Sequence, residues 1–525
     1  MEYKYKYLHI CAPSTRMLKG FIVMLNNHFN TSEHYFLCRT TSDGLDGFTT
    51  LHKNVINWKD LGRGKLNKFI GAIKAFKASQ NIIIHGFTFS MKWMLLLYLC
   101  RDQLRKKGIW IVWGADLYNY RRKSGSRLFN MLVNHIEESL RISCRTSVVV
   151  FPTDISVFKR AFGEERTLFC APLGFSEISF SQWDHILEVR RGIEEKHPGY
   201  FTSPDRRISI QVGHNAFPFN EHAKALTALE HYKENNILIT MPMSYGNDYG
   251  ENAQEGYEKD TEQLGKNLFG PEKIRVLKGL LPLRKYNEFL GAVDVAILCA
   301  PRQNALGNII PLLYMGKKIF LSKDNPLFSF FRKIGFEIHD VMEISTVPFK
   351  EFISPVKTAF PHPWIKNIYS IEWNAQKWEV VFGYSDGRYT REEAYAAMDK
   401  IDGREKQLID DYLKNEGKRE KKEEDKKLQE RVCAELMQLR DWLEKREAED
   451  QKALAEKEER KAEWKRRVEE YVKTIKSEEK RKKEAEPNKT TPFTVRVETK
   501  DSGYDNNKYI LVYKYKKGIV ENVQK

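Results

Sequence analysis

Chemically capable side chains stand just beyond two apolar runs in the first part of the chain. The run from Ile109 to Trp113 leads into Gly114 and Asp116, and the run from Ile82 to Ile84 leads into His85. Runs of this kind are typical of strands buried on both faces of a parallel sheet. A carboxylate or an imidazole placed there can take a proton from a substrate hydroxyl. Asp116 is our first candidate for that role and His85 the second. Each could instead orient the acceptor or cap a local turn, and Asp116 could also cap the next helix.

Loops in the second part of the chain carry residues suited to a phosphate ligand. Arg302 follows the apolar run 295–299 and precedes a predicted helix, so its guanidinium and the helix N-terminus could both bind a diphosphate. Gly213 would let backbone amides approach the same ligand. The remaining candidates for nucleotide-sugar binding are Asn215, Asn220, Glu221, Tyr245, Gln303 and Asn304. The chain has no GxxxxGK[ST] loop, which argues against a P-loop kinase.

The elements that must position these loops form two alternating series of strands and helices. In the first series we expect strands at 6–12, 35–39, 82–85, 109–113 and 147–151, with helices at 15–29, 92–104 and 126–140. In the second we expect strands at 208–212, 237–241, 274–277, 295–299 and 318–322, with helices at 220–233 (capped by Asn220), 286–290, 308–315 and 364–382. Alternation of this kind implies parallel pairing and doubly wound α/β sheets. Two such domains would face one cleft, where ligands commonly bind.

Composition divides the chain further. We expect an N-terminal Rossmann-like domain at 1–171, a Pro- and Gly-rich linker at 172–205, a second Rossmann-like domain at 206–365, a closing helix at 366–383, a charged helical segment at 384–490 and a β-hairpin at 491–525. Two short heptad stripes in the charged segment leave a single long helix and a self-associating coiled coil both open.

The positive charge is concentrated at one end of the chain. The net charge is +16, and residues 1–173 hold 26 Lys and Arg against 12 Asp and Glu, a difference of +14. This distribution favours an anionic partner, either a membrane surface or a phosphate ligand. Nucleic acid is disfavoured because RNP-type aromatics and zinc spacings are absent. The seven Cys have neither framework nor CxxC spacing, which argues against a disulfide scaffold and against a zinc site. We expect no metal and no cofactor.

The order and spacing of the loops resemble a known family. The bacterial glycosyltransferase family 56 comprises the TDP-4-acetamido-4,6-dideoxygalactose (Fuc4NAc) transferases of enterobacterial common antigen assembly, and the resemblance covers about residues 1–383. The matching stretches are His85-Gly86, Trp113 to Tyr118, Asn220-Glu221-His222, Pro242-Met243 with Tyr245, Arg302-Gln303 and Asn325-Pro326. Departures lie where the donor should bind. The family's Arg-Gln-Gln-Gly-x-Gly reads Arg302 to Gly307 as RQNALG, and its Gly-Asn-Ser reads Gly213-His214-Asn215.

This resemblance implies a GT-B fold that needs no metal, with the acceptor on the first domain and the sugar nucleotide on the second. We therefore expect transfer of a Fuc4NAc-like amino-deoxy sugar from a nucleotide diphosphate, dTDP by resemblance, to a polyprenyl-diphosphate-linked saccharide in cell-surface polysaccharide assembly. Such an enzyme would be cytoplasmic and peripheral on the inner face of the cell membrane, since the chain shows neither a secretory leader nor an apolar run of membrane-spanning length. The alternative is a catalytically degenerate transferase-like scaffold that binds through its basic face and charged helix.

Overall fold

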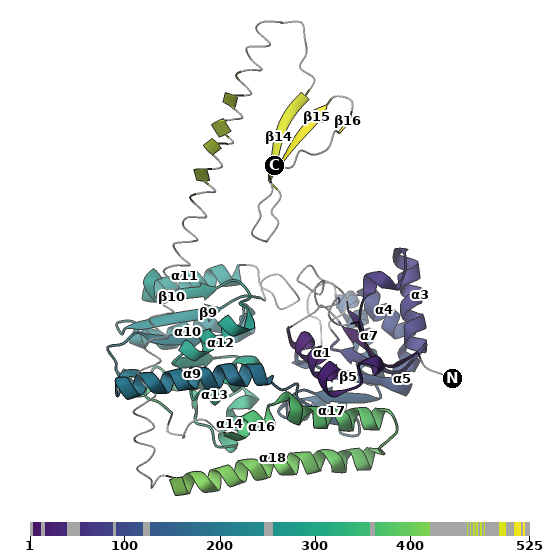
Figure 1. Cartoon of the computed structure of the whole chain (residues 1–525), viewed down its shortest axis with the longest axis horizontal. Coiled ribbons are helices and arrows are strands. Elements are labelled where there is room, and N and C mark those ends of the chain that lie inside the picture. The colour runs from purple at the N-terminus through teal and green to yellow at the C-terminus, as the bar shows by residue number, and fades with distance from the viewer. Residues whose placement is uncertain are drawn as a thin grey trace. The chain divides into compact units, whose positions relative to one another are not determined.

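The computed structural model describes residues 4–11, 16–38, 53–87, 91–118, 127–245, 256–356, 363–419, scattered positions from 459 to 477, and residues 493–499, 509–515 and 518–519. The chain divides into two compact units, Met1–Leu439 and Arg440–Lys525. The first unit contains both large sheets and is shown in Figure 1. The two predicted heptad stripes lie outside the described residues.

The first sheet has seven strands in the order β3-β2-β1-β4-β5-β6-β7, all parallel. Its strands are β1 (Tyr5–Cys11), β2 (His34–Cys38), β3 (Val55–Asn57), β4 (Ser79–His85), β5 (Gly108–Val112), β6 (Thr146–Val149) and β7 (Thr167–Cys170). Its helices are α1 (Arg16–His28), α3 (Gly64–Lys77), α4 (Met91–Leu99), α5 (Arg101–Lys107), α6 (Ala115–Tyr118), α7 (Arg127–Ser143) and α8 (Asp154–Phe162). One apolar core includes residues of α1, and the core on the other face includes residues of α3, α4, α5, α7 and α8.

The second sheet has six strands in the order β10-β9-β8-β11-β12-β13, again all parallel. Its strands are β8 (Ile208–Val212), β9 (Ile237–Pro242), β10 (Ile274–Leu277), β11 (Val295–Leu298), β12 (Lys318–Leu321) and β13 (Ile338–Asp340). Its helices are α10 (His222–Leu229), α11 (Tyr257–Phe269), α12 (Leu283–Ala292), α13 (Leu306–Tyr314), α14 (Pro326–Lys333) and α15 (Phe349–Phe352). Two separate doubly wound parallel sheets confirm the expected fold class.

The segment expected to be a linker contains a long helix of the second core. Helix α9 (Glu177–Lys196) begins at Ser176, whose hydroxyl accepts a hydrogen bond from the Ser179 amide. Phe180 and Trp183 of this helix are buried against α13 and α14 in one apolar cluster. The Pro and Gly residues that suggested a linker flank the helix. We therefore place the start of the second domain near residue 176.

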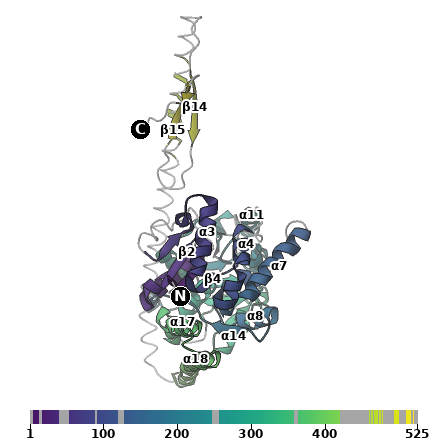
Figure 2. The same ribbon diagram turned by 90° about the vertical axis from the view of Figure 1, so that its right-hand side faces the viewer.

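The chain then returns to the first sheet. The expected closing helix is two helices, α16 (Pro363–Ile368) and α17 (Ile371–Ser385), and Trp378 of α17 is buried in the first core. Helix α18 (Arg391–Arg419) lies beside α17 in both views (Figure 1 and Figure 2). Met398 packs in the first core, while Tyr412 packs against the second. The charged segment therefore begins as a helix that belongs to both domains.

The second compact unit contains a small antiparallel sheet. Strand β14 (Phe493–Thr499) pairs with β15 (Tyr509–Tyr515), which confirms the expected hairpin. A short third strand, β16 (Gly518–Ile519), pairs with the other edge of β15.

Candidate active site

Doubly wound sheets bind ligands beyond the carboxyl ends of their strands, where the strand order reverses. In the first sheet this point lies between β1 and β4, and in the second between β8 and β11. His85 ends β4, Gly213 follows β8, and Arg302 belongs to the loop after β11. Asp116 follows β5, one strand further along the sheet. The topology therefore places three of the predicted residues at the two switch points and Asp116 beside one of them.

Asp116 holds the loops around it together. The side chain is 2% exposed, and its Oδ2 accepts hydrogen bonds from the Trp110 indole at 2.7 Å and the Phe87 amide at 3.2 Å. Its Oδ1 accepts from the Trp113 amide at 3.0 Å. Burial raises the pKa of this carboxyl, and these donors and Arg141 oppose the shift. Both oxygens are thus occupied, which suits a positioning role better than proton transfer.

His85 has one ring nitrogen engaged and one available. Its Nε2 lies 3.0 Å from His9 Nδ1, while its buried Nδ1 has no hydrogen-bond partner among the described residues. Burial lowers the pKa of His85 to about 3, so the ring is neutral at physiological pH. In the tautomer that is protonated at Nε2, the lone pair at Nδ1 can accept a proton.

Arg302 is half-buried, and two nitrogens of its head group are buried without polar partners in the described part of the chain. Its Nε and Nη1 have no hydrogen-bond partner in the described part of the chain, and neither do the amide oxygen and nitrogen of Asn304. The guanidinium stacks on Phe219, 4.0 Å from the ring centroid, and lies 5.6 Å from that of Tyr118. Burial lowers the pKa of Arg302. A half-buried cation and an unpartnered amide in one loop are a suitable environment for an anionic ligand.

The backbone of this loop is held from the next loop of the sheet. The side-chain amide of Asn325 donates to the carbonyl of Ala300 at 3.0 Å and that of Arg302 at 2.8 Å. Its oxygen also caps α14 by accepting from the Leu327 amide. Ala305, at the start of α13, has a left-handed backbone with φ 58°. The family resemblance places glycine there, which adopts this conformation without strain.

Gly213 is required for close packing rather than for an exposed amide. Its φ is 66°, and a Cβ at this position would collide with the His222 ring. His222 Nδ1 lies 3.0 Å from the Tyr257 hydroxyl, and its Nε2 has no partner among the described residues. Burial lowers the pKa of His222 to about 3. Gly213 therefore allows an imidazole from α10 to lie directly against the strand end.

Asn215, Asn220 and Tyr245 form one hydrogen-bonded group. Asn220 Nδ2 donates to Asn215 Oδ1 at 2.6 Å, and Asn215 Nδ2 lies 3.4 Å from the Tyr245 hydroxyl. The expectation that Asn220 caps a helix is wrong. Helix α10 begins after Glu221, whose backbone is left-handed, and the Asn220 side chain instead binds the preceding loop. The position of Asn220 before a helical pattern predicted a cap and did not indicate its hydrogen bonds to the preceding loop.

The remaining predicted residues, Glu221 and Gln303, make other contacts. Glu221 is partly exposed and forms an ion pair with Lys224 at 3.6 Å. A Cβ on Gly114 would lie 3.6 Å from Gln303 Oε1, so the loops after β5 and β11 approach each other. Residues of both sheets therefore meet near Arg302.

The sequence reasoning missed Asp154, which lies at the start of α8 after β6. Its Oδ1 accepts a hydrogen bond from the Tyr118 hydroxyl at 2.7 Å, and its buried Oδ2 has no partner in the described part of the chain. Burial raises the pKa of Asp154 to about 6, and Arg302 opposes that shift. The available signal was the same as for Asp116, namely an Asp a few residues beyond an apolar run. Among the described residues, no group of His, Cys, Asp and Glu could hold a metal ion.

Comparison with known proteins matches one part of the chain to a family. Residues 193–339 match the family described as "4-alpha-L-fucosyltransferase glycosyl transferase group 56". A glycosyltransferase from Rickettsia africae is similar in structure, with a TM-score of 0.45 and 13% identity over 77% of this chain and 99% of that one. Anabaena HepE in complex with UDP-glucose gives a TM-score of 0.46 and 11% identity over 76% of this chain and 98% of that one.

The family match spans β8 to β13, and so includes Gly213, Asn220, Arg302 and Asn325. Arg302 carries unpartnered buried nitrogens, Asn220 and Asn325 form the hydrogen bonds described above, and Gly213 allows the close approach of His222. The chain is therefore a glycosyltransferase, and its residues 193–339 match the family model of glycosyl transferase group 56.

Proposed function

We propose that this enzyme transfers a Fuc4NAc-like amino-deoxy sugar from a nucleoside diphosphate, dTDP, to a polyprenyl-diphosphate-linked saccharide in cell-surface polysaccharide assembly. The observation that carries the proposal is that Arg302 and Asn304, in one loop where the second sheet reverses its strand order, have buried polar atoms without partners among the described residues. The family description supports a deoxyhexose donor.

Departure of the nucleoside diphosphate leaves negative charge at the broken bond. Arg302 can offer its guanidinium donors to phosphate oxygens, and the N-terminus of α13 adds its dipole. Groups fixed before the reaction stabilise such charge without reorganisation. Asn215, Asn220 and Tyr245 then form the neighbouring wall of the proposed donor site, and Glu221 and Gln303 its rim.

We assign the proton acceptor to His85 rather than to Asp116. The acceptor hydroxyl must lose a proton as its oxygen attacks the anomeric carbon. His85 stands at the switch point of the first sheet with Nδ1 free of partners in the described residues, whereas three N–H groups occupy Asp116. Asp116 then keeps the positions of Trp113 and Phe87 around His85.

A lipid-linked acceptor requires access to a membrane surface. Within the described part of the chain, no helix has the length and apolar composition needed to cross a bilayer. Among the described residues, eight of the thirteen large apolar side chains that are exposed lie on three helices of one face of the first sheet. They are Leu66 and Ile70 on α3, Leu95 and Leu99 on α4, and Phe129, Met131, Leu132 and Ile142 on α7.

The same helical face carries positive charge. Helices α3, α4 and α5 hold nine Lys and Arg against one acidic residue, Asp102. Each basic group near an anionic leaflet contributes about 1 kcal/mol, and apolar side chains add area that leaves water on insertion. We therefore propose that this face docks on an anionic membrane, which places the acceptor domain beside its substrate.

Donor identity can be tested by thermal unfolding with a panel of dTDP-, UDP- and GDP-linked sugars. A ligand at one hundred times its dissociation constant stabilises the folded enzyme by about 2.7 kcal/mol. We expect a dTDP-linked amino-deoxyhexose to stabilise the wild type and to be hydrolysed slowly without acceptor. Stabilisation by another nucleotide would correct the donor, and absence of any stabilisation would contradict the proposal.

Membrane docking is measured separately by co-sedimentation with vesicles. The double variant Leu95→Ser/Leu99→Ser should bind vesicles of anionic lipid more weakly than the wild type. The matched control is Leu280→Ser/Leu283→Ser, which removes exposed leucines from the second domain. Equal loss in the two variants would refute the assigned face.

A further inference from the structure

Three buried histidines form a continuous line across the first sheet. His85 Nε2 lies 3.0 Å from His9 Nδ1, and His9 Nε2 lies 3.0 Å from His34 Nδ1. They come from the adjacent strands β4, β1 and β2 and are separated in sequence by up to 76 residues. His9 is fully buried and stacks on Phe36, with Phe21 at its edge.

The spacing constrains the protons on these rings. In each N···N contact one nitrogen donates and the other accepts, so three neutral rings must share one direction of donation. Either every Nε2 or every Nδ1 in the line is protonated. Burial lowers the pKa of His9 well below its ordinary value, with His85 and His34 adding to the effect. The line therefore holds neutral imidazoles and can change only by shifting all its protons together.

The two ends of the line have different surroundings. At one end His85 Nδ1 is buried and without a partner among the described residues, at the carboxyl edge of the sheet. At the other end His34 lines a cavity of about 370 Å³ near the amino ends of β1 and β2. Lys6, Glu33 and Arg388 line the same cavity. The histidines thus connect the proposed reaction centre with a polar cavity on the opposite edge.

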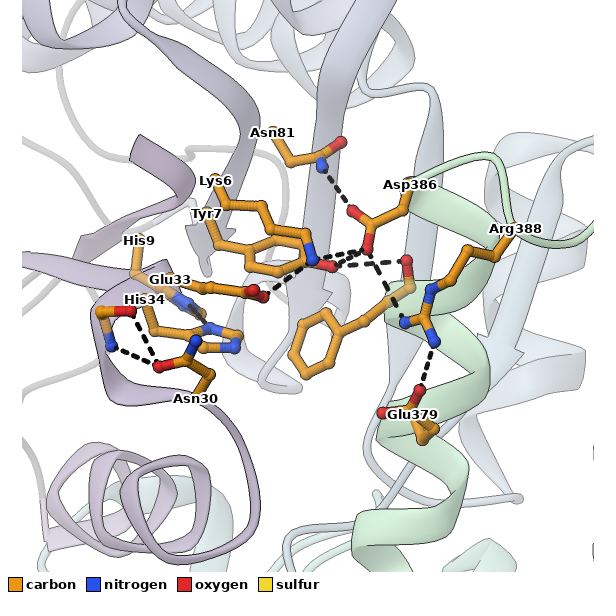
Figure 3. A network of polar contacts seen from close by, with 12 residues as sticks. Lys6, Tyr7, His9, Asn30, Glu33, His34, Asn81, Glu379, Asp386 and Arg388 are labelled. Carbon is orange, nitrogen blue, oxygen red and sulfur yellow. Dashed lines mark hydrogen bonds and ion pairs between the residues drawn. The ribbon is translucent and has the colours of Figure 1, made fainter. Parts of the chain in front are cut away.

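The groups around that cavity are fixed by ion pairs (Figure 3). Lys6 binds Glu33 at 2.8 Å and Asp386 at 3.3 Å, and Arg388 binds Glu379 at 2.5 Å. The Tyr7 hydroxyl donates to Asp386 at 2.5 Å, and its ring stacks on His34. Burial, and secondarily Lys6, lowers the pKa of His34 to about 3. His34 is therefore neutral at physiological pH and lines the cavity as an uncharged imidazole.

We propose that His9 and His34 are positioning and proton-relay residues for His85, carrying the proton of the acceptor hydroxyl from the reaction centre to the cavity at the other edge of the sheet. The inference rests on the proposed function only for the source of that proton. It explains how a histidine too buried to become charged can serve as a base.

The transfer balances as follows. The acceptor oxygen forms its bond to the anomeric carbon while the bond to the diphosphate breaks, and the diphosphate leaves with the electron pair. The hydroxyl proton moves to His85 Nδ1, the His85 Nε2 proton to His9 Nδ1, and the His9 Nε2 proton to His34 Nδ1. The His34 Nε2 proton enters cavity water. After product release the shift runs backwards, with His85 giving its proton to solvent and His34 taking one up.

The kinetic test uses the full chain and the substitutions His9→Gln and His34→Gln. A glutamine can donate and accept hydrogen bonds but does not exchange its protons along a line. We expect kcat to fall by about 10²-fold, within the range for loss of acid–base catalysis, with the donor KM little changed. Activity should recover partly as pH rises, because hydroxide can then accept the proton.

The matched control is His28→Gln, which changes a histidine that lines the same cavity outside the relay. Its kcat should match that of the wild type. Wild-type kcat in both relay variants would overturn the relay and leave the glycosyltransferase proposal intact.

A second measurement needs neither turnover nor a stable variant. In ¹⁵N-histidine-labelled wild type, couplings across the two N–H···N hydrogen bonds should be detected, and the three rings should remain neutral at pH 7. Absence of these couplings, or an imidazolium at any of the three positions, would refute the relay. If the couplings are present but no sugar nucleotide is turned over, the hydrogen-bonded line of histidines stands and the proposed function is wrong.

Discussion

The loops that end β5 and β11 both follow buried parallel strands, but their polar groups are satisfied to different degrees. In the β5 loop, three N–H groups meet the two oxygens of Asp116. In the β11 loop, Arg302 and Asn304 keep buried polar atoms without partners among the described residues. A closed set of hydrogen bonds stabilises the fold, whereas an open set has a cost that a ligand can offset. The number of hydrogen-bond partners, more than the residue type, therefore distinguishes a polar group that stabilises the fold from one that is suited to bind a ligand.

The largest expected effect concerns the β11 loop, whose polar groups lack partners among the described residues. Arg302→Ala should lower kcat/KM by about 10²–10³-fold, comparable to removal of one donor that stabilises developing charge. The free energy of unfolding should change by less than about 1 kcal/mol, because the side chain has few polar partners to lose. Steady-state kinetics and urea unfolding measure the two quantities. The control is Arg284→Ala, an exposed arginine of the same domain; unchanged kinetics in Arg302→Ala would remove Arg302 from the site.

The next effect concerns the β5 loop, in which Asp116 accepts three hydrogen bonds. Asp116→Asn places an amide N–H₂ against N–H donors, so the free energy of unfolding should fall by about 2–3 kcal/mol. The folded Asp116→Asn variant should retain measurable donor hydrolysis, because Asp116 positions the β5 loop and does not accept the proton of the acceptor hydroxyl. Asp102→Asn, at an exposed site, is the control. Full stability with complete loss of turnover would restore Asp116 as the catalytic base.

A smaller effect concerns Asp154, which lies between these two cases. A bound diphosphate disfavours its ionised form, so its pKa in the complex should exceed the value of about 6 that burial produces in the free enzyme. Donor binding then takes up a proton above pH 6, and affinity should fall about tenfold between pH 5.5 and 7.5 by linkage. Calorimetry should find this dependence absent in Asp154→Asn. A persistent dependence would assign the titration to another group.

The smallest effect concerns Asn325, whose side chain donates hydrogen bonds to two carbonyls of the β11 loop. Asn325→Ala removes an N-cap and two hydrogen bonds to loop carbonyls, which should lower the free energy of unfolding by about 1 kcal/mol. The donor dissociation constant should rise a few-fold because the loop is less ordered. Asp340→Ala removes another N-cap of this domain and serves as control. Equal donor affinity in both variants would show that the loop needs no such support.

Sequence patterns were sufficient to predict strands that are continuous apolar runs. They were insufficient to predict a very short strand and a helix flanked by Pro and Gly. Strands β1, β4, β5, β8 and β11 lie where their runs predict. Strand β3 has only three residues, and α9 is flanked by the Pro and Gly residues that suggested a linker. A short edge strand is defined by its neighbour rather than by its own composition. These two elements therefore became visible only when their packing partners were known.

The sequence by itself determined which residue types follow the buried strands, and so identified His85, Asp116, Gly213 and Arg302, because the apolar runs of a doubly wound sheet fix where its loops begin. Only the tertiary structure decided their roles. Hydrogen bonds between distant residues satisfy Asp116, leave Arg302 open and align His85 with His9 and His34. Such contacts depend on strand order and register, which no local pattern encodes.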